Sequence, residues 1–358
     1  MRPMRKLFSI LSLAGVGLFA GNLHAQNDYK VLDTTQLMGN GGIDYVYADN
    51  DERRVYVPRG GNTYVFDLDT HKYIGAITNI GGHGVAVDTK SHHGFASGPK
   101  VGMFDTETMQ KIKDIDVQGR PDGILREPFT GKILVLSHET PNVTFIDPQD
   151  GAVTGTLDLG GGPEQAQSDG QGMLYVDLED KDQVAVVDLK AMKVTAHYDL
   201  QGKGGGPGGL GLDAKNHILF SMCHDPATCV VLNADNGNIL ATLPIGSGTD
   251  GGGFNPNTME AWSSQRDGTL TIIKENSPTD FAVEQTVQTK AGCKTSTLDS
   301  ENNRIVLICT ERAPQPAAAA TEAPATPPPA ATNAPAGERR RGGRGGGPGN
   351  LDVLWVGR

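Results

Sequence analysis

The fold is decided by a pattern that residues 117–147 carry, VQGRPDGILREPFTGKILVLSHETPNVTFID. The stretch begins with a Gly/Pro-rich entry, continues through a short strand and a turn, and then runs into two apolar strands that a second turn separates. The last of these strands ends in Ile146-Asp147, and a polar strand leads on to the next Gly-rich entry. Alternation with period 2 and turn residues between short apolar runs are typical of antiparallel β-structure.

The same pattern recurs along the whole chain. The ends of the third strands lie 38, 42, 41, 45 and 41 residues apart. A repeat of about 40 residues with four strand-like segments indicates a β-propeller blade. We therefore expect an all-β, seven-bladed β-propeller with four-stranded antiparallel blades. The aligned strand ends are Phe66-Asp67, Phe104-Asp105, Ile146-Asp147, Val187-Asp188, Leu232-Asn233 and Ile273-Lys274.

The seventh blade is interrupted. Its first two strands are expected near residues 293–298 and 304–309, and residues 312–350 then become rich in Ala, Pro, Arg and Gly. This composition cannot build a core and predicts a disordered insertion. Residues 351–358 form the final strand, and residues 28–33 supply the missing fourth one. The N-terminal strand should therefore close the last blade, which removes exposed sheet edges.

The first 25 residues are typical of a secretory signal peptide. A positively charged segment precedes the apolar run Leu7–Ala20, and Leu23-His24-Ala25 matches a small-residue cleavage site. The mature chain would therefore begin near Gln26, and residues 26–311 would form the propeller blades. The apolar run is too short to span a membrane comfortably. We expect a periplasmic or secreted protein without a membrane span.

Charge narrows the range of partners. The formal net charge is −11. The 48 glycines are a separate feature and suit a chain with many tight turns. An acidic body disfavours nucleic-acid binding, so no specific nucleic acid is expected as a partner. The expected partner is a protein or a small polar ligand, and the protein is expected to be a monomer.

Four cysteines form two pairs in the sequence. Cys223 and Cys229 flank one expected hairpin turn, and Cys293 and Cys309 flank another. Export favours two disulfides across adjacent strands. The alternative for the first pair is a metal site that also includes His224.

Residues 117–147 also resemble the YVTN repeat, with the entry Arg120-Pro121-Asp122-Gly123 and the strand Asn142–Asp147. Met173-Leu174-Tyr175-Val176 and Val184–Asp188 repeat the match. The resemblance covers residues 29–311 and 351–358. It implies a seven-bladed propeller, and members of that family are mostly exported or surface proteins without a common chemistry. Blades 5 and 6 depart from the pattern, because Asn and Lys stand where Asp is usual.

The entry loops should meet on one face, around the central channel. The candidate binding residues there are His83, Arg120, Asp122, Glu164 and Asp250. The alternative is that these residues are solvated loop residues that fill a wet channel. Their mixed charges and the lack of a ligand spacing predict no metal site, no cofactor and no catalytic residue. The Asp at each third-strand end is expected to stabilise a turn.

Two functional classes remain open. The sequence contains no phosphate-binding loop, haem attachment motif or nucleophile elbow, which favours an exported, non-enzymatic binding or interaction scaffold. The alternative is a periplasmic enzyme, a lactonase-like or metal-dependent hydrolase, with a metal held by His83, Asp122 and Glu164. Whether those side chains approach a single point distinguishes the two hypotheses.

Overall fold

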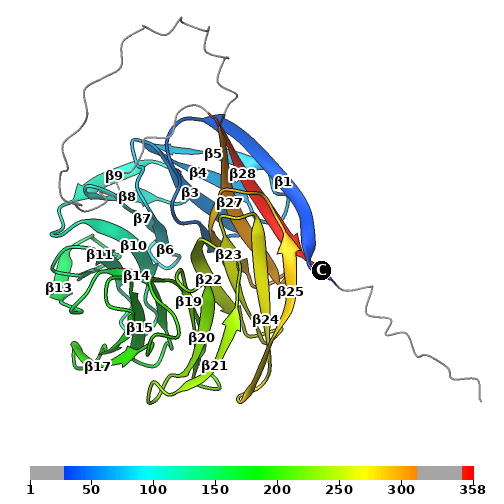
Figure 1. The fold of residues 1–358 in the computed structure, drawn as a ribbon. Helices are drawn as coiled ribbons and strands as arrows, with labels where there is room; N and C mark the ends of the chain where they lie inside the picture. Colours follow the sequence, from blue (N-terminus) through cyan, green and yellow to red (C-terminus); the bar gives the residue numbers. More distant parts are fainter. Residues whose placement is uncertain (1–27, 313–348) are drawn as a thin grey trace, which may run out of the picture.

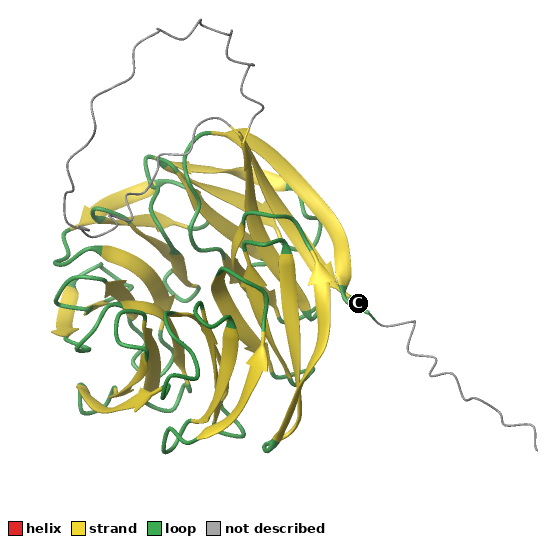
Figure 2. Cartoon of the chain, in the orientation of Figure 1, coloured by secondary structure: helices red, strands yellow, loops and turns green. Residues whose placement is uncertain are grey.

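A computed structural model describes residues 28–312 and 349–358. The described chain forms seven four-stranded antiparallel sheets arranged in a ring, as Figures 1 and 2 show. The seven-bladed propeller predicted from the repeat is confirmed. The predicted signal peptide and almost all of the predicted insertion lie outside the described residues.

Each blade begins with its innermost strand. Blades 1 to 3 contain β2 (Tyr47–Asp49), β3 (Arg54–Arg59), β4 (Asn62–Asp67), β5 (Tyr73–Thr78), β6 (Val85–Asp88), β7 (His93–Ser97), β8 (Val101–Asp105), β9 (Lys111–Ile115), β10 (Pro121–Arg126), β11 (Ile133–Ser137), β12 (Val143–Ile146) and β13 (Val153–Leu157). Blades 4 and 5 contain β14 (Pro163–Ser168), β15 (Met173–Leu178), β16 (Gln183–Asp188), β17 (Lys193–Asp199), β18 (Pro207–Asp213), β19 (Ile218–Cys223), β20 (Thr228–Asn233) and β21 (Ile239–Pro244). Blades 6 and 7 contain β22 (Thr249–Asn255), β23 (Glu260–Gln265), β24 (Thr269–Ser277), β25 (Asp280–Gln288), β26 (Cys293–Asp299), β27 (Arg304–Arg312), β28 (Gly349–Gly357) and β1 (Lys30–Gly39).

The N-terminal strand closes the ring as predicted. Strand β1 pairs antiparallel with β28, and the sheet order of blade 7 is β1-β28-β27-β26. Figure 1 shows the blue β1 beside the red β28. The pairing runs from Lys30 opposite Gly357 to Gly39 opposite Gly349. The outer strand of the last blade therefore comes from the opposite end of the chain.

The core lies between neighbouring blades. One cluster of buried side chains joins blades 7 and 1, with Trp355 and Val306 packed against Val55 and Phe66. These four side chains are completely buried. Each large aliphatic or aromatic side chain buried in this way contributes roughly 1.5–3 kcal/mol. Because every blade packs against two others, the ring holds the innermost strands in fixed positions around the axis.

The innermost strands leave a narrow cavity along the axis. Blades 5 and 6 approach each other closely, because glycines let their backbones meet: a methyl group at Gly209 would lie 2.6 Å from the carbonyl carbon of Gly251. The remaining space is a cavity of about 360 Å³. Polar side chains line part of it, among them Tyr45, Glu164 and Gln165. The residues near its end thus share one small polar space.

The third-strand aspartates stabilise turns, as the sequence predicted. Asp67 Oδ1 accepts hydrogen bonds from the backbone N–H groups of Asp69 and Thr70 at 3.1 and 2.7 Å. Asp105 binds the N–H of Thr108 in the same way. These carboxylates are therefore part of the blade architecture.

The cysteine prediction is half right. Cys293 and Cys309 form a disulfide, but Cys223 and Cys229 are buried free thiols, so the predicted second disulfide is wrong. In that hairpin Cys223 pairs with Thr228, which shifts Cys229 one position along the ladder. Side chains alternate between sheet faces, so Cys223 packs between blades 4 and 5 while Cys229 packs between blades 5 and 6. Opposite faces exclude both the disulfide and the alternative metal site.

The structure also bears on membrane insertion. No part of the described chain forms a helix with the length and apolar character that crossing a bilayer requires.

Candidate functional site

One structurally equivalent position recurs in every blade, at the start of the innermost strand. Asp122 directly follows Pro121, which pairs with Ser137 of the second strand. Glu164 follows Pro163 in the same relation to its own blade. The seven residues at this position, which we call the inner ring, are Asp44, His83, Asp122, Glu164, Gly208, Asp250 and Lys294.

A local irregularity directs the inner ring toward the axis. In five blades the pairing register shifts at this position, for example between Pro121 and Ile124. A β-bulge of this kind frees one residue from the ladder and changes the direction of its side chain. The preceding glycine permits a close approach, because Gly82 has a φ of 156° and a methyl group there would overlap the Ser97 carbonyl oxygen at 1.8 Å. The Gly-rich entries thus serve to bring the inner ring together.

A second set of residues surrounds the first. In each blade, the residue just before the inner-ring residue pairs with a residue of the second strand. The residue that follows this partner belongs to the second set, so it lies one strand further from the axis. His138 follows Ser137, and Glu179 follows Leu178. The outer ring, as we call it, consists of Gly60, Gly98, His138, Glu179, His224, Arg266 and Thr310.

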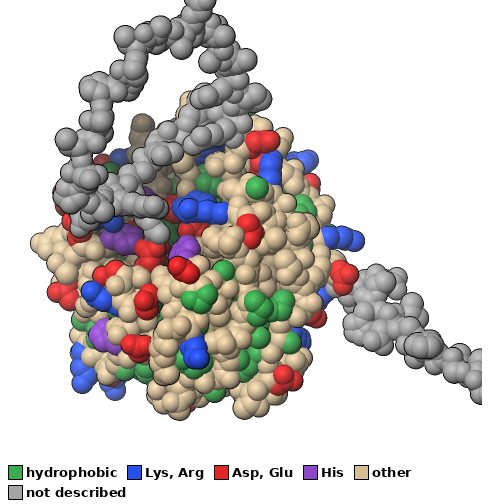
Figure 3. Space-filling view, in the orientation of Figure 1, with side chains coloured by type: hydrophobic (Ala, Val, Ile, Leu, Met, Phe, Trp, Pro, Cys, Tyr) green, Lys and Arg blue, Asp and Glu red, His purple; other side chains and the backbone are tan. Residues whose placement is uncertain are grey.

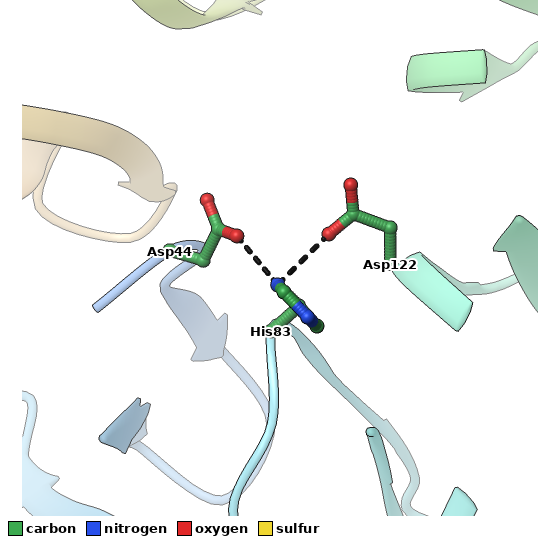
Figure 4. Close-up of side chains that lie close together, drawn as sticks. All are labelled: Asp44, His83 and Asp122. Carbon is green, nitrogen blue, oxygen red and sulfur yellow. Dashed lines mark hydrogen bonds and ion pairs between the residues drawn. The ribbon is translucent and has the colours of Figure 1, made fainter. Parts of the chain in front are cut away.

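The first group of contacts connects blades 1, 2 and 3 (Figure 4). His83 Nδ1 lies 2.6 Å from Asp44 Oδ2 and 3.1 Å from Asp122 Oδ1. The side chain of His83 is 47% exposed, whereas Asp122 as a residue is only 9% exposed. An imidazole that reaches two carboxylates at the rim of a channel is accessible to solvent and to ligands.

The second group connects blades 3 and 4 and lies deeper. His138 Nε2 is 2.5 Å from Asp122 Oδ2 and 3.8 Å from Glu164 Oε1. The Tyr45 hydroxyl, from blade 1, donates across the channel to Glu164 Oε2 at 3.3 Å. The Ser97 hydroxyl donates to the backbone carbonyl of Asp122 and fixes that residue. Asp122 therefore takes part in both groups, through different oxygens.

The opposite side of the mouth carries cations. Lys294 Nζ contacts Asp44 Oδ1 at 2.5 Å and Asp250 Oδ2 at 3.3 Å, and Arg266 pairs with Asp250 at 2.7 Å. Figure 3 shows acidic, basic and histidine side chains gathered around a hollow on this face. The cations lie beside Asp44 and Asp250, away from Glu164.

Burial and charge crowding perturb the titration of the site. Burial, together with the neighbouring carboxylates of Glu179, Asp122 and Asp250, raises the pKa of Glu164 to about 9. Burial alone would raise the pKa of Asp44, but His83 and Lys294 lower it below its usual range. The carboxylates of Glu179, Asp122 and Asp250 thus oppose the ionisation of Glu164.

The structure brings together most of the predicted site residues. His83, Asp122 and Glu164 belong to the connected groups, but no set of metal-ligand atoms in the described residues contains both His83 and Glu164, so the three-residue metal site of the hydrolase alternative is not formed. Asp250 joins these groups through Lys294. Arg120 is exposed, and its backbone carbonyl accepts a hydrogen bond from the N–H of His138.

Sequence reasoning missed Asp44, Lys294 and the outer ring. Asp44 and Lys294 occupy the same repeat position as Asp122, in blades 1 and 7. The signal was therefore present, because Gly41-Gly42 and Gly292 lead into these positions as glycines do in the other blades. His138 follows a second strand, which offers no comparable sequence signal.

Two sets of ligand atoms suit a metal ion. Asp44, His83 and Asp122 form one set, and Asp122, His138 and Glu164 form the other; within each set all ligand atoms lie within 4.8 Å of one another. Ligands about 2.0–2.1 Å from a tetrahedral ion lie roughly 3.3–3.4 Å apart. The observed separations of 2.6, 3.1, 2.5 and 3.8 Å bracket that distance. These contacts therefore lie near the ligand spacing of a tetrahedral ion, and the remaining pair in each set lies within 4.8 Å.

A larger cavity lies at the far end of the innermost strands. It has a volume of about 430 Å³ and is lined by Asp49, Asp88 and Arg126. Asp49 caps its own turn, and Asp88 is paired with Arg126 at 2.9 Å. These acids are engaged in local structure, and the described residues contain no third metal-ligand set.

The fold and the site define a seven-bladed β-propeller with a histidine- and carboxylate-lined channel mouth. No family model and no curated protein matches the chain. Among 1541 matching chains of solved structures, one belongs to the "Crystal Structure of Mitotic Checkpoint Complex". Its TM-score is 0.67 at 13% identity, and the alignment covers 85% of this chain and 95% of that chain. This similarity supports the propeller fold, whereas membership of the YVTN-repeat family stays a prediction.

Proposed function

We propose that the protein is an exported β-propeller that binds a divalent transition-metal ion at its channel mouth. The observation that carries the proposal is the convergence of two imidazoles and two further carboxylates around Asp122. Imidazole and carboxylate ligands suit ions such as zinc, manganese and cobalt. This proposal keeps the binding role expected from the sequence and replaces its unspecified polar ligand with a metal ion.

An unsatisfied atom supports a cation as the ligand. Asp122 Oδ1 is buried and accepts no hydrogen bond. Its neighbour His83 Nδ1 carries at most one proton, and the shorter contact of that nitrogen is to Asp44. A buried carboxylate oxygen without a hydrogen-bond donor is costly. A metal ion between these groups would satisfy it.

Export is supported by two features. Residues 1–25 have the charge and apolar pattern typical of a signal peptide, and the Cys293–Cys309 disulfide suits an oxidising compartment. N-terminal sequencing of protein from the periplasm or medium of an expressing cell should give a chain that begins at Gln26. Recovery of protein that retains Met1 only in the cytoplasm would contradict export.

Metal titration tests the binding proposal. Mature protein is treated with a chelator, dialysed and titrated with zinc by isothermal calorimetry at pH 7.5. Asp122→Asn removes the shared ligand and should weaken zinc binding by at least 100-fold. Asp235→Asn is a matched control, because Asp235 pairs with His217 at 2.7 Å on the surface and lies in neither ligand set. Equal losses in both variants, or no zinc binding by the wild type, would contradict the proposal.

A hydrolase is the second candidate. Each set supplies three protein ligands, and a three-ligand site with an open position is typical of catalytic rather than structural zinc. His83 lies at the exposed rim, where a small substrate has access. Hydrolysis of a panel of esters and lactones by zinc-loaded protein, absent from Asp122→Asn, would support this role. Zinc binding without turnover would leave the binding role alone.

A further inference from the structure

We infer that the channel mouth holds a pair of metal ions bridged by the carboxylate of Asp122. The inference rests on the metal-binding function proposed above and specifies its stoichiometry. It starts from the two oxygens of a single side chain. Asp122 Oδ1 faces His83 at 3.1 Å, and Asp122 Oδ2 faces His138 at 2.5 Å.

The ligands divide into two sets that do not merge. Asp44 and His83 belong to the first set, His138 and Glu164 belong to the second, and only Asp122 belongs to both. The five residues do not form one group whose ligand atoms all lie within 4.8 Å of one another. One ion therefore cannot contact all five side chains without a rearrangement of the mouth, whereas two ions each find three ligands in place.

The shared carboxylate sets the spacing of the ions. An ion bound to each oxygen of one carboxylate lies about 3.5–4 Å from the other, the separation found in two-metal sites. The surroundings of the two oxygens also differ, because Oδ2 of Asp122 lies within hydrogen-bond distance of His138, while the buried Oδ1 lies 3.1 Å from His83 without a hydrogen bond. The two oxygens are already engaged differently, as two distinct ions require.

The surroundings favour the arrangement. Lys294 holds Asp44 Oδ1, which leaves Asp44 Oδ2 facing His83. The Ser97 hydroxyl binds the backbone carbonyl of Asp122 and leaves both carboxylate oxygens to the ligand sets.

The two positions differ in exposure. The His83 side chain is 47% exposed, and that of His138 is 19% exposed. The ion held by Asp44, His83 and Asp122 should therefore exchange with solvent first. A weak chelator should remove one ion rapidly and the second slowly.

Native mass spectrometry of the mature, zinc-loaded protein after gel filtration tests the inference. The wild type should carry two zinc ions. His83→Gln and His138→Gln each disable one set and should each carry one. His217→Gln is a matched control, because His217 pairs with Asp235 on the surface outside both sets, and it should keep two.

The outcomes separate this inference from the function on which it rests. One zinc in the wild type, lost completely in either His83→Gln or His138→Gln, would overturn the paired-ion arrangement and leave a single-ion site. No zinc in the wild type would overturn the metal-binding function itself. As a readout that needs no variant, manganese-loaded wild type should give an exchange-coupled electron paramagnetic resonance spectrum. The spectrum of isolated manganese would contradict the bridge.

Discussion

Arg59 connects the two ends of the ring, and its replacement tests how the propeller is closed. It is 1% exposed, and its guanidinium donates hydrogen bonds to four backbone carbonyls at 3.0–3.2 Å. Leu37 and Gly39 lie in β1, Gly349 begins β28, and Gly41 follows β1. A single side chain of blade 1 thus holds both outer strands of blade 7. The perturbation is Arg59→Leu, which keeps much of the volume and removes all four donors.

The expected loss follows from these bonds. A hydrogen bond from a charged donor contributes a net ~1.5 kcal/mol or more, so the four together are worth at least about 6 kcal/mol. A buried leucine returns about 2 kcal/mol through apolar burial. Arg59→Leu should therefore lower the free energy of unfolding by about 4 kcal/mol. If the loss is confined to opening of β1, amide exchange in Lys30–Gly39 should accelerate by on the order of 1000-fold.

Urea denaturation and hydrogen–deuterium exchange measure the two effects. Lys100→Leu is the control, because the Lys100 side chain is 54% exposed and pairs with Asp116. This substitution removes a surface cation that takes no part in the pairing of β1 with β28. Exposed pairs of this kind contribute about 0–1 kcal/mol. Unchanged exchange in Lys30–Gly39 of the Arg59 variant, or an equal loss in the control, would refute the reasoning.

Three further predictions concern the scaffold. Replacing Cys293 and Cys309 by alanine should lower the free energy of unfolding by about 3 kcal/mol, since the disulfide closes a loop with a sequence separation of 16; urea titration measures the loss, and one below about 1 kcal/mol would contradict this reasoning. Burial and a neighbouring carboxyl raise the pKa of Glu275 from 4.5 to about 7, so the wild type loses stability as the pH rises through that interval. The free energy of unfolding of Glu275→Gln, relative to that of the wild type, should consequently be about 3 kcal/mol higher at pH 8 than at pH 4. The same difference between the two proteins at both pH values, measured by urea titration, would count against this prediction. Gly209→Ala should lower the free energy of unfolding by about 3 kcal/mol or more, because the added methyl group would lie 2.6 Å from the backbone of Gly251. Thermal and urea unfolding measure this loss, and a nearly neutral result would mean that blades 5 and 6 separate easily.

The sequence predicted the architecture because the architecture repeats. Strand alternation, turn residues and the period of about 40 residues all pointed to one fold. The closure was predictable for the same reason, since the last blade lacked one strand and residues 28–33 matched it. These features depend on local patterns, which a single sequence displays.

The cysteines show where local patterns fail. Both pairs flank a turn almost symmetrically, yet only Cys293 and Cys309 lie opposite each other. A register shift between Cys293 and Ser296 brings that pair into line, whereas Cys223 faces Thr228 and its intended partner is displaced by one residue. A slip of one residue reverses the face of every side chain. Sequence symmetry around a turn does not reveal bulges, so it predicted one pair correctly and the other wrongly.

The candidate site was predicted in part for a related reason. Asp122, His83 and Glu164 follow recognisable Gly-rich entries, and alignment of the repeats placed them at the mouth. His138 reaches Asp122 from the end of a second strand, and the contact depends on a β-bulge that the residue types do not predict. The contacts between blades, which create both ligand sets, depend on how far each innermost strand advances toward the axis. That distance is a property of packing rather than of any one repeat.

The repeated scaffold explains why four of the five candidate ligands lie at one position per blade, with His138 as the exception. The inner-ring residue lies at a bulge, where it contributes little to strand pairing, so its identity is free to vary between blades. Gly208 shows the limit of that freedom: a methyl group there would lie 2.8 Å from His224 Nε2, so the outer-ring histidine occupies the space that a side chain would need. If the ligand sets act as proposed, exchanging inner-ring residues between blades should change metal binding while the propeller itself stays folded.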